Sequence, residues 1–223
     1  MSIKRLYCAI ALFTLVLLAK CRPSESKLNY LPTKHIDTAA YKQLQKQFNL
    51  NYVFKSHEYL GDLTPNYPLA FASQMLFDHQ GKTISRDTDG VDGGFFPSVR
   101  KIIVKKDSTY ILLNNRQEVK RFYAPISSPE EALAYATLYN RSFAAFGDFF
   151  NKKKYKYVGD KPASSYSVKK DEYYEVHLFS YKAFGCDHPY FSEVFKVDKD
   201  GSVTLISKKR SFTDPADDHM CVD

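Results

Sequence analysis

The chain has 223 residues, of which 44% are hydrophobic and 26% charged, so it can bury a core and is not an intrinsically disordered chain. Its nine glycines and ten prolines exclude fibrous and low-complexity classes, and its four cysteines are too few for a disulfide scaffold. The length fits one or at most two domains. The formal net charge of +7 would favour an anionic polymer as partner if the whole charge belonged to the folded chain.

The first twenty residues have the pattern of an export signal. Lys4 and Arg5 precede an uncharged run from Leu6 to Ala19. At about 1.5 Å per residue this run reaches roughly 21 Å, which is shorter than the roughly 30 Å hydrocarbon core of a membrane. We therefore expect residues 1–20 to be a signal peptide and not a membrane span. Without them 29 basic residues face 25 acidic ones, and that balance gives no reason to expect nucleic acid as a partner.

The uncharged run is followed by a cysteine, in the sequence Leu18-Ala19-Lys20-Cys21. This segment resembles the lipobox of bacterial lipoproteins, in which a leucine and small residues precede the cysteine that becomes lipidated; Lys20 stands where the motif has a small residue. The resemblance covers about the first tenth of the chain and implies that acyl chains on Cys21 anchor the protein to a membrane of the cell envelope. The alternative is ordinary signal cleavage with Ala19 and Cys21 at the small-residue positions, which would give a secreted soluble protein.

The pattern after the signal predicts a tether at residues 21–35 and a single domain at residues 36–223. Ala40, Leu44 and Phe48 recur at four-residue steps and predict a helix over residues 38–48 that stops at Asn49. Between residues 60 and 98 glycine and proline interrupt every regular pattern, so we expect turns and one strand there.

The middle of the chain predicts a hairpin and then a helix. Two β-rich runs, residues 99–104 and 110–113, flank a polar turn, and residues 119–123 suit a third strand. Ser128-Pro129-Glu130-Glu131 is a helix start with a capping box, and this helix is expected to run to about Arg141 and to resume over residues 143–150.

The last third of the chain predicts antiparallel strands. Residues 173–181 alternate, with Tyr174, Val176 and Leu178 on one face. Residues 191–197 and 203–207 flank the turn Asp198-Lys199-Asp200-Gly201 as a hairpin. The expected fold is therefore α+β, an antiparallel sheet of hairpins and meanders packed against one main helix.

Two cysteines remain once Cys8, in the signal, and Cys21 are assigned. In an oxidising compartment Cys186 and Cys221 most simply form a disulfide between the chain's tail and a loop between strands. The alternative is a metal site, because Cys186, His188, His219 and Cys221 form a Cys-x-His and a His-x-Cys pair whose side chains converge if both segments are extended.

Two further stretches are candidate binding sites. Asp87, Asp89 and Asp92 lie in a glycine-containing loop that offers oxygens to Ca²⁺, although the spacing departs from the EF-hand and a solvated turn is the simpler interpretation. The other stretch interleaves lysines with aromatic residues and would suit an anionic ligand, with a helix end followed by a strand as the simpler interpretation. Its lysines are Lys152, Lys153, Lys154 and Lys156.

The sequence contains no nucleophile elbow, phosphate-binding glycine loop or dinucleotide fingerprint. We therefore expect no cofactor and a non-catalytic binding or structural module, lipid-anchored in the envelope, whose partner beyond the membrane is an envelope protein or a polysaccharide. The alternative is an envelope hydrolase or metal-dependent enzyme that uses the Cys186, His188, His219 and Cys221 neighbourhood.

Overall fold

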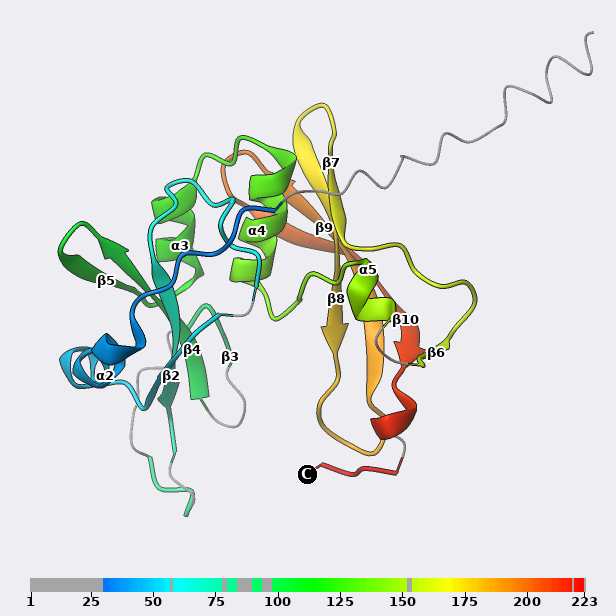
Figure 1. Ribbon diagram of the computed structural model, residues 1–223, viewed down its shortest axis with the longest axis horizontal. Coiled ribbons are helices and arrows are strands. Elements are labelled where there is room, and N and C mark those ends of the chain that lie inside the picture. Colours follow the sequence, from blue (N-terminus) through cyan, green and yellow to red (C-terminus); the bar gives the residue numbers. More distant parts are fainter. Residues whose placement is uncertain are drawn as a thin grey trace, which may run out of the picture.

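The computed structural model describes residues 30–56, 58–77, 80–83, 90–93, 98–151, 154–217 and 219–222. These residues form antiparallel sheets and several short helices, which confirms the predicted α+β class. There are two five-stranded sheets where the sequence analysis expected one (Figure 1). We call them sheet 1, formed by β1 to β5, and sheet 2, formed by β6 to β10.

Sheet 1 is centred on β4, which pairs with β2 along one edge and with β3 and then β5 along the other. The predicted hairpin is confirmed, because Lys106 of β4 lies opposite Thr109 of β5. The strands are β1 (Tyr52–Phe54), β2 (Leu69–Met75), β3 (Asp92–Gly93), β4 (Ser98–Lys106) and β5 (Thr109–Leu113).

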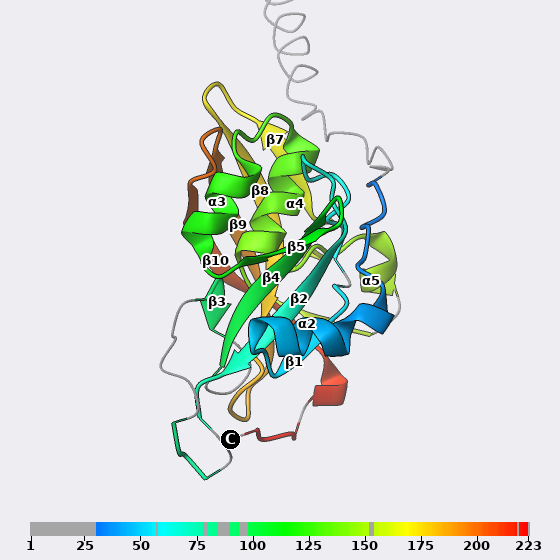
Figure 2. The same cartoon turned by 90° about the vertical axis from the view of Figure 1, so that its left-hand side faces the viewer.

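One face of sheet 1 is covered by α2 (Tyr41–Phe48), which continues the short 3-10 helix η1 (Thr38–Ala40) (Figure 2). Leu44 of α2 is fully buried and belongs to the same apolar cluster as Ile103 of β4. Asn49 ends the helix in the left-handed conformation, with φ 52°, as its sequence predicted.

Sheet 2 has the strand order β6-β10-β9-β8-β7, and all its pairs are antiparallel. The predicted strand at residues 173–181 and the predicted hairpin are confirmed, although the hairpin strands are longer than expected. The strands are β6 (Lys156–Tyr157), β7 (Tyr166–Lys169), β8 (Tyr173–Tyr181), β9 (Pro189–Asp198) and β10 (Val203–Thr213), followed by the 3-10 helix η2 (Pro215–Asp217).

The helix α4 (Pro129–Tyr139) lies between the two sheets (Figure 1). Every residue from Glu131 to Leu138 is buried, which explains why this segment is apolar around its whole circumference. Side chains from both sheets join it in one apolar cluster, including Ile102 of β4 and Val176 of β8. Ser128 caps the helix as predicted, since its hydroxyl accepts a hydrogen bond from the Glu131 amide at 3.1 Å.

The expected strand at residues 119–123 is wrong, because these residues lie in the helix α3 (Arg116–Tyr123). Asn115 caps this helix by accepting a hydrogen bond from the Glu118 amide at 3.0 Å. Val119 and Tyr123, four residues apart, then bury the same face. The β-forming tendency of the local sequence is overridden by this cap and by the helical spacing of its two buried residues.

Two other segments differ in detail from expectation. The helix expected to resume at Phe143 begins only at α5 (Gly147–Asn151). Residues 30–35, at the end of the predicted tether, pack on the domain: Tyr30 lies against Phe146, with ring centroids 4.7 Å apart, and His35 forms a parallel bridge with Leu69.

Candidate functional site

The structure pairs Cys186 and Cys221 in a disulfide, as the sequence predicted. The bridge closes a sequence separation of 35 residues and joins the end of the chain to the loop between β8 and β9. Gly185 and Val222, next to the two cysteines, also exchange backbone hydrogen bonds at 2.8 and 3.0 Å. The tail of the chain is therefore fixed to sheet 2 both covalently and by hydrogen bonds.

The alternative prediction, a metal site formed by Cys186, His188, His219 and Cys221, is wrong. Both sulfurs are in the disulfide, so neither is a thiolate that could bind a metal. His188 is 4% exposed, and its ring nitrogens lie 3.2 Å from the Lys182 carbonyl oxygen and 2.8 Å from that of Met220. His219 is exposed. His188 thus links two backbone segments, and among the described residues no group of three His, Cys, Asp or Glu side chains could hold a metal ion.

The other sequence candidates are only partly described. Cys21, Asp87, Asp89, Lys152 and Lys153 lie outside the described residues. The backbone of Asp92 begins β3.

Lys154 and Lys156 are exposed, whereas the tyrosines between and after them pack into the protein. The rings of Tyr155 and Tyr157 lie 4.8 and 5.9 Å from the buried ring of Phe212. This packing favours the simpler interpretation of the stretch, in which the rings are structural and only the lysines face solvent.

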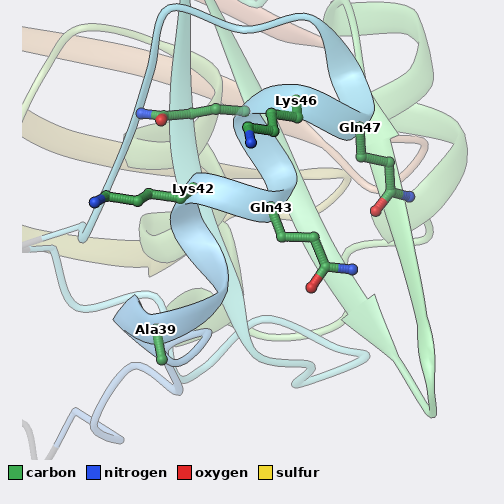
Figure 3. A pocket seen from close by; sticks show the side chains of 6 residues that line it. Ala39, Lys42, Gln43, Lys46 and Gln47 are labelled. Atoms are coloured by element: carbon green, nitrogen blue, oxygen red, sulfur yellow. The ribbon is translucent and has the colours of Figure 1, made fainter.

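Two hollows are present on the described surface. The larger, about 970 Å³, lies over the solvent-facing side of α2 (Figure 3). Its six lining residues all come from this helix and the turn that precedes it, and the labelled side chains spread apart instead of converging. A convex helix surface of this kind offers no enclosed binding site. The lining residues are Ala39, Lys42, Gln43, Gln45, Lys46 and Gln47.

The second hollow, about 570 Å³, lies where α4 ends over sheet 2. We call it the Glu193 pocket. Its size is within the range of small-molecule sites, and its lining combines apolar walls with a few convergent polar groups. The lining residues are Asn140, Arg141, Ser142, Ser180, Tyr181, Lys182, Phe191, Glu193, Phe195, Leu205 and Lys208.

Four of these side chains form one hydrogen-bonded group, the Glu193 cluster, made of Ser142, Ser180, Glu193 and Lys208. Glu193 is 5% exposed, and its Oε1 accepts a hydrogen bond from Ser180 Oγ at 2.7 Å and forms an ion pair with Lys208 Nζ, also at 2.7 Å. Its Oε2 accepts one from Ser142 Oγ at 2.5 Å. Lys208 Nζ also donates to Ser180 Oγ at 3.1 Å. The buried carboxylate is therefore both ion-paired and hydrogen-bonded.

A β-bulge in β10 places Lys208 in this cluster. The register of β9 and β10 shifts between Leu205 and Ser207, so that Leu205 faces Phe195 and Lys208 faces Glu193. In a regular strand, residues three apart lie on opposite faces of the sheet. The extra residue at the bulge brings both Leu205 and Lys208 onto the pocket face.

The serines of the cluster have no neutral base beside them among the described contacts. A serine is activated by a neutral base that removes its proton, but Lys208 is held by the Glu193 carboxylate in an ion pair. Both serine hydroxyls donate to that carboxylate. The side chain of Lys208 is 44% exposed, so part of it faces the pocket and solvent.

A second buried acid, Glu58, lies near the same end of α4. Burial raises the pKa of its carboxyl to about 7, and a hydrogen bond from the Ala144 amide and the charge of Arg100 partly oppose that rise. Arg100 itself donates to the carbonyl oxygens of Leu138 and Asn140 at 2.9 and 3.0 Å, and so caps α4 from sheet 1. Glu58 lines neither hollow.

The sequence analysis did not find the Glu193 cluster, although one signal pointed to it. Residues 191, 193, 195 and 197 alternate onto one face of β9 and read Phe, Glu, Phe, Val, so a carboxylate interrupts an otherwise apolar face. A carboxylate at a buried position needs hydrogen-bond or ion-pair partners, because burial removes it from water. Those partners come from three other elements, and only the fold brings them together.

No described helix is long and apolar enough to cross a membrane. Comparison of the chain with protein-family models, with curated proteins and with solved structures found no match.

Proposed function

We propose that this protein is an exported envelope protein, held at a membrane by acyl chains on Cys21, that acts as a non-catalytic binding module. The observation that carries the binding role is the Glu193 pocket, where a half-exposed lysine and apolar side chains line a hollow of about 570 Å³. The Cys186–Cys221 disulfide supports export, because such bonds persist in oxidising compartments.

The binding role is favoured over a hydrolytic one by the state of the two pocket hydroxyls. Ser142 and Ser180 each donate to Glu193, and Lys208 beside them is ion-paired with the same carboxylate. A hydrolase would need a base to accept a proton from one of these serines, together with donors for an oxyanion. We therefore propose that the module binds an envelope molecule reversibly at the pocket.

The anchor is tested by intact mass on protein exported by its native route. We expect a mature chain that begins at Cys21, carries acyl chains and has lost two hydrogen atoms at the disulfide. The variant Cys21→Ala should leave the membrane fraction, whereas Cys8→Ala, within the expected signal, should not change it. A mature mass without acyl chains would remove the anchor from the proposal.

The binding role is tested with a chromogenic acyl ester such as p-nitrophenyl decanoate. We expect no burst of nitrophenol and no acyl adduct on the protein, and the variant Ser180→Ala should match the wild type. Turnover that Ser180→Ala or Ser142→Ala abolishes, or an acyl-enzyme mass, would contradict a non-catalytic module.

A further inference from the structure

We infer that the Glu193 pocket binds amphiphilic anions, molecules that join a carboxylate or similar head group to an apolar chain. This inference rests on the proposed binding role and adds the chemical class of the ligand. It follows from three properties of the pocket: its charge, the donors that its cluster leaves unused, and an apolar wall that is open to solvent.

The charge of the pocket is positive. Lys182 and Lys208 line it with two cationic groups, against the single carboxylate of Glu193. That carboxylate already accepts two hydrogen bonds, forms the ion pair with Lys208 and is 5% exposed, so a ligand cation would find it both buried and occupied. An anion meets the excess positive charge instead.

Lys208 is the group that would hold the anion. Within the described part of the chain, its ammonium group forms an ion pair with Glu193 and donates one hydrogen bond, to Ser180. An ammonium group has three N–H donors, so donor capacity is left for solvent or a ligand, and the contact of the ammonium with the Phe191 ring, 4.6 Å from its centroid, restrains the side chain. A cation held in this way is preorganised, so little side-chain entropy is lost when an anion binds.

The apolar part of the ligand would lie on Leu205, Phe191 and Phe195, which line the pocket beside Lys208. Leu205 shares the pocket face of sheet 2 with Phe195, yet 48% of its surface is exposed. The helix α4, which covers this face further along, ends at Tyr139. A leucine beside a cation at the uncovered end of a sheet face suits a ligand that is apolar at one end and anionic at the other.

The test is calorimetric titration of the purified protein with three probes that share a ten-carbon chain: decanoate, decanol and decyltrimethylammonium. We expect decanoate to bind with a stoichiometry of one and at least about tenfold more tightly than the other two, because only its head group forms a charge-assisted hydrogen bond. Preference for the cation, equal affinity for all three or binding of none would overturn the ligand class.

Substitutions in the cluster should change decanoate affinity in opposite directions. Lys208→Met removes the anchor and should weaken binding about tenfold, whereas Glu193→Gln releases the ammonium and should strengthen it severalfold. Lys208→Met alone leaves the buried Glu193 carboxylate without its cation, which could unfold the protein. The double variant Lys208→Met/Glu193→Gln has no such unpaired charge. It should bind decanoate as weakly as Lys208→Met does, which would show that the loss of affinity is not caused by misfolding. The matched control is Lys209→Met, an exposed lysine next in β10, which should bind as the wild type does.

The contribution of the apolar wall is tested by a substitution at Leu205. Leu205→Asn should weaken decanoate severalfold and leave the much weaker binding of acetate unchanged. If Glu193→Gln weakens decanoate, or if Lys208→Met leaves it unchanged, the pocket does not hold anions through Lys208. Such results would reject the ligand class, whereas the non-catalytic role is tested separately by the ester turnover described above.

Discussion

The two sheets differ in how completely helices cover them, and the proposed binding pocket lies where the helices no longer cover sheet 2. Sheet 1 is covered by α2 on one face and by α3 and α4 on the other, and β4 is buried almost without interruption from Ser98 to Val104. In sheet 2 the strand β9 alternates between buried and partly exposed positions. Val197 and Phe195 of β9 are buried in the apolar cluster that contains α4. The next residue on that face of β9, beyond the end of α4, is the carboxylate Glu193.

This difference shows how a fold can separate stability from binding. A strand that is buried on both faces is fixed by packing, so its residues have little freedom to take part in function. A sheet face that a helix covers over only part of its length provides a rigid floor with an open end. The Glu193 cluster occupies that open end, at the boundary between apolar core and solvent.

The largest effect is expected in the doubly covered sheet. Ile103 of β4 is fully buried against α2, so Ile103→Ala should lower the free energy of unfolding by about 4 kcal/mol through lost burial and a cavity. Ile206, 54% exposed at the bulge of β10, is the matched control, and Ile206→Ala should change stability by less than about 0.5 kcal/mol. Urea denaturation measures both. Similar losses for the two variants would mean that the sheets do not differ in the way described.

The disulfide comes next, because it fixes the tail of the chain to the open end of sheet 2. Replacing both Cys186 and Cys221 by alanine should lower stability by about 4 kcal/mol, the value that the chain-entropy relation gives for a loop that spans 35 residues. Amide exchange should increase at the β8–β9 loop and at the tail but not in sheet 1. Faster exchange spread evenly over both sheets would contradict the local role given to the bridge.

A smaller effect is expected at the Glu193 cluster. Lys208→Met leaves a nearly buried carboxylate without its cation and should cost about 2 kcal/mol, and addition of Glu193→Gln should restore part of the loss. Lys209→Met, on the exposed surface of the same strand, should have almost no effect. Thermal unfolding of the wild type, Lys208→Met, Glu193→Gln and the double variant gives the coupling energy between the two residues. Additive losses would show that the pair is not coupled.

The last expected effect is a change of stability with pH, caused by Glu58 on the sheet 1 side of the end of α4. Burial raises the pKa of Glu58 from 4.5 to about 7, so between these values the folded protein holds a proton that the unfolded chain has released. The free energy of unfolding should therefore fall as the pH rises from 4.5 to about 7, by about 3 kcal/mol, and this contribution should be constant above that range.

Glu58→Gln should remove this slope and keep an acceptor for the Ala144 amide. Glu172→Gln is the control, because the side chain of Glu172 is 88% exposed. Denaturant curves at several pH values separate the two variants. If the free energy of unfolding of Glu58→Gln still falls between pH 4.5 and 7, another group causes the pH dependence.

Much of the fold could be predicted from local sequence patterns. The β4–β5 hairpin, the strand β8 and the Ser128 cap of α4 each follow from residues that are close in the sequence. The helix α3 was predicted as a strand because Val119, Phe122 and Tyr123 favour β-structure, and the deciding cap at Asn115 lies outside that short run.

The site could be predicted only in part. The disulfide follows from counting cysteines, since two are left once the signal and the lipidation candidate are assigned. The Glu193 cluster draws on the end of α4 and on three strands, and the β10 bulge reverses the face that simple alternation assigns to Lys208. Such long-range pairing and a one-residue shift of register leave no pattern that a single sequence shows.

The central claim, that the uncovered end of sheet 2 is the ligand site, is tested most directly by NMR chemical-shift mapping of the protein titrated with decanoate. The amides that shift should gather at Ser142, Ser180, Phe191 and Leu205, and the same titration with Lys208→Met should abolish most of the shifts. Shifts that gather instead on α2 or the β1 edge of sheet 1, or that persist unchanged in Lys208→Met, would contradict the claim.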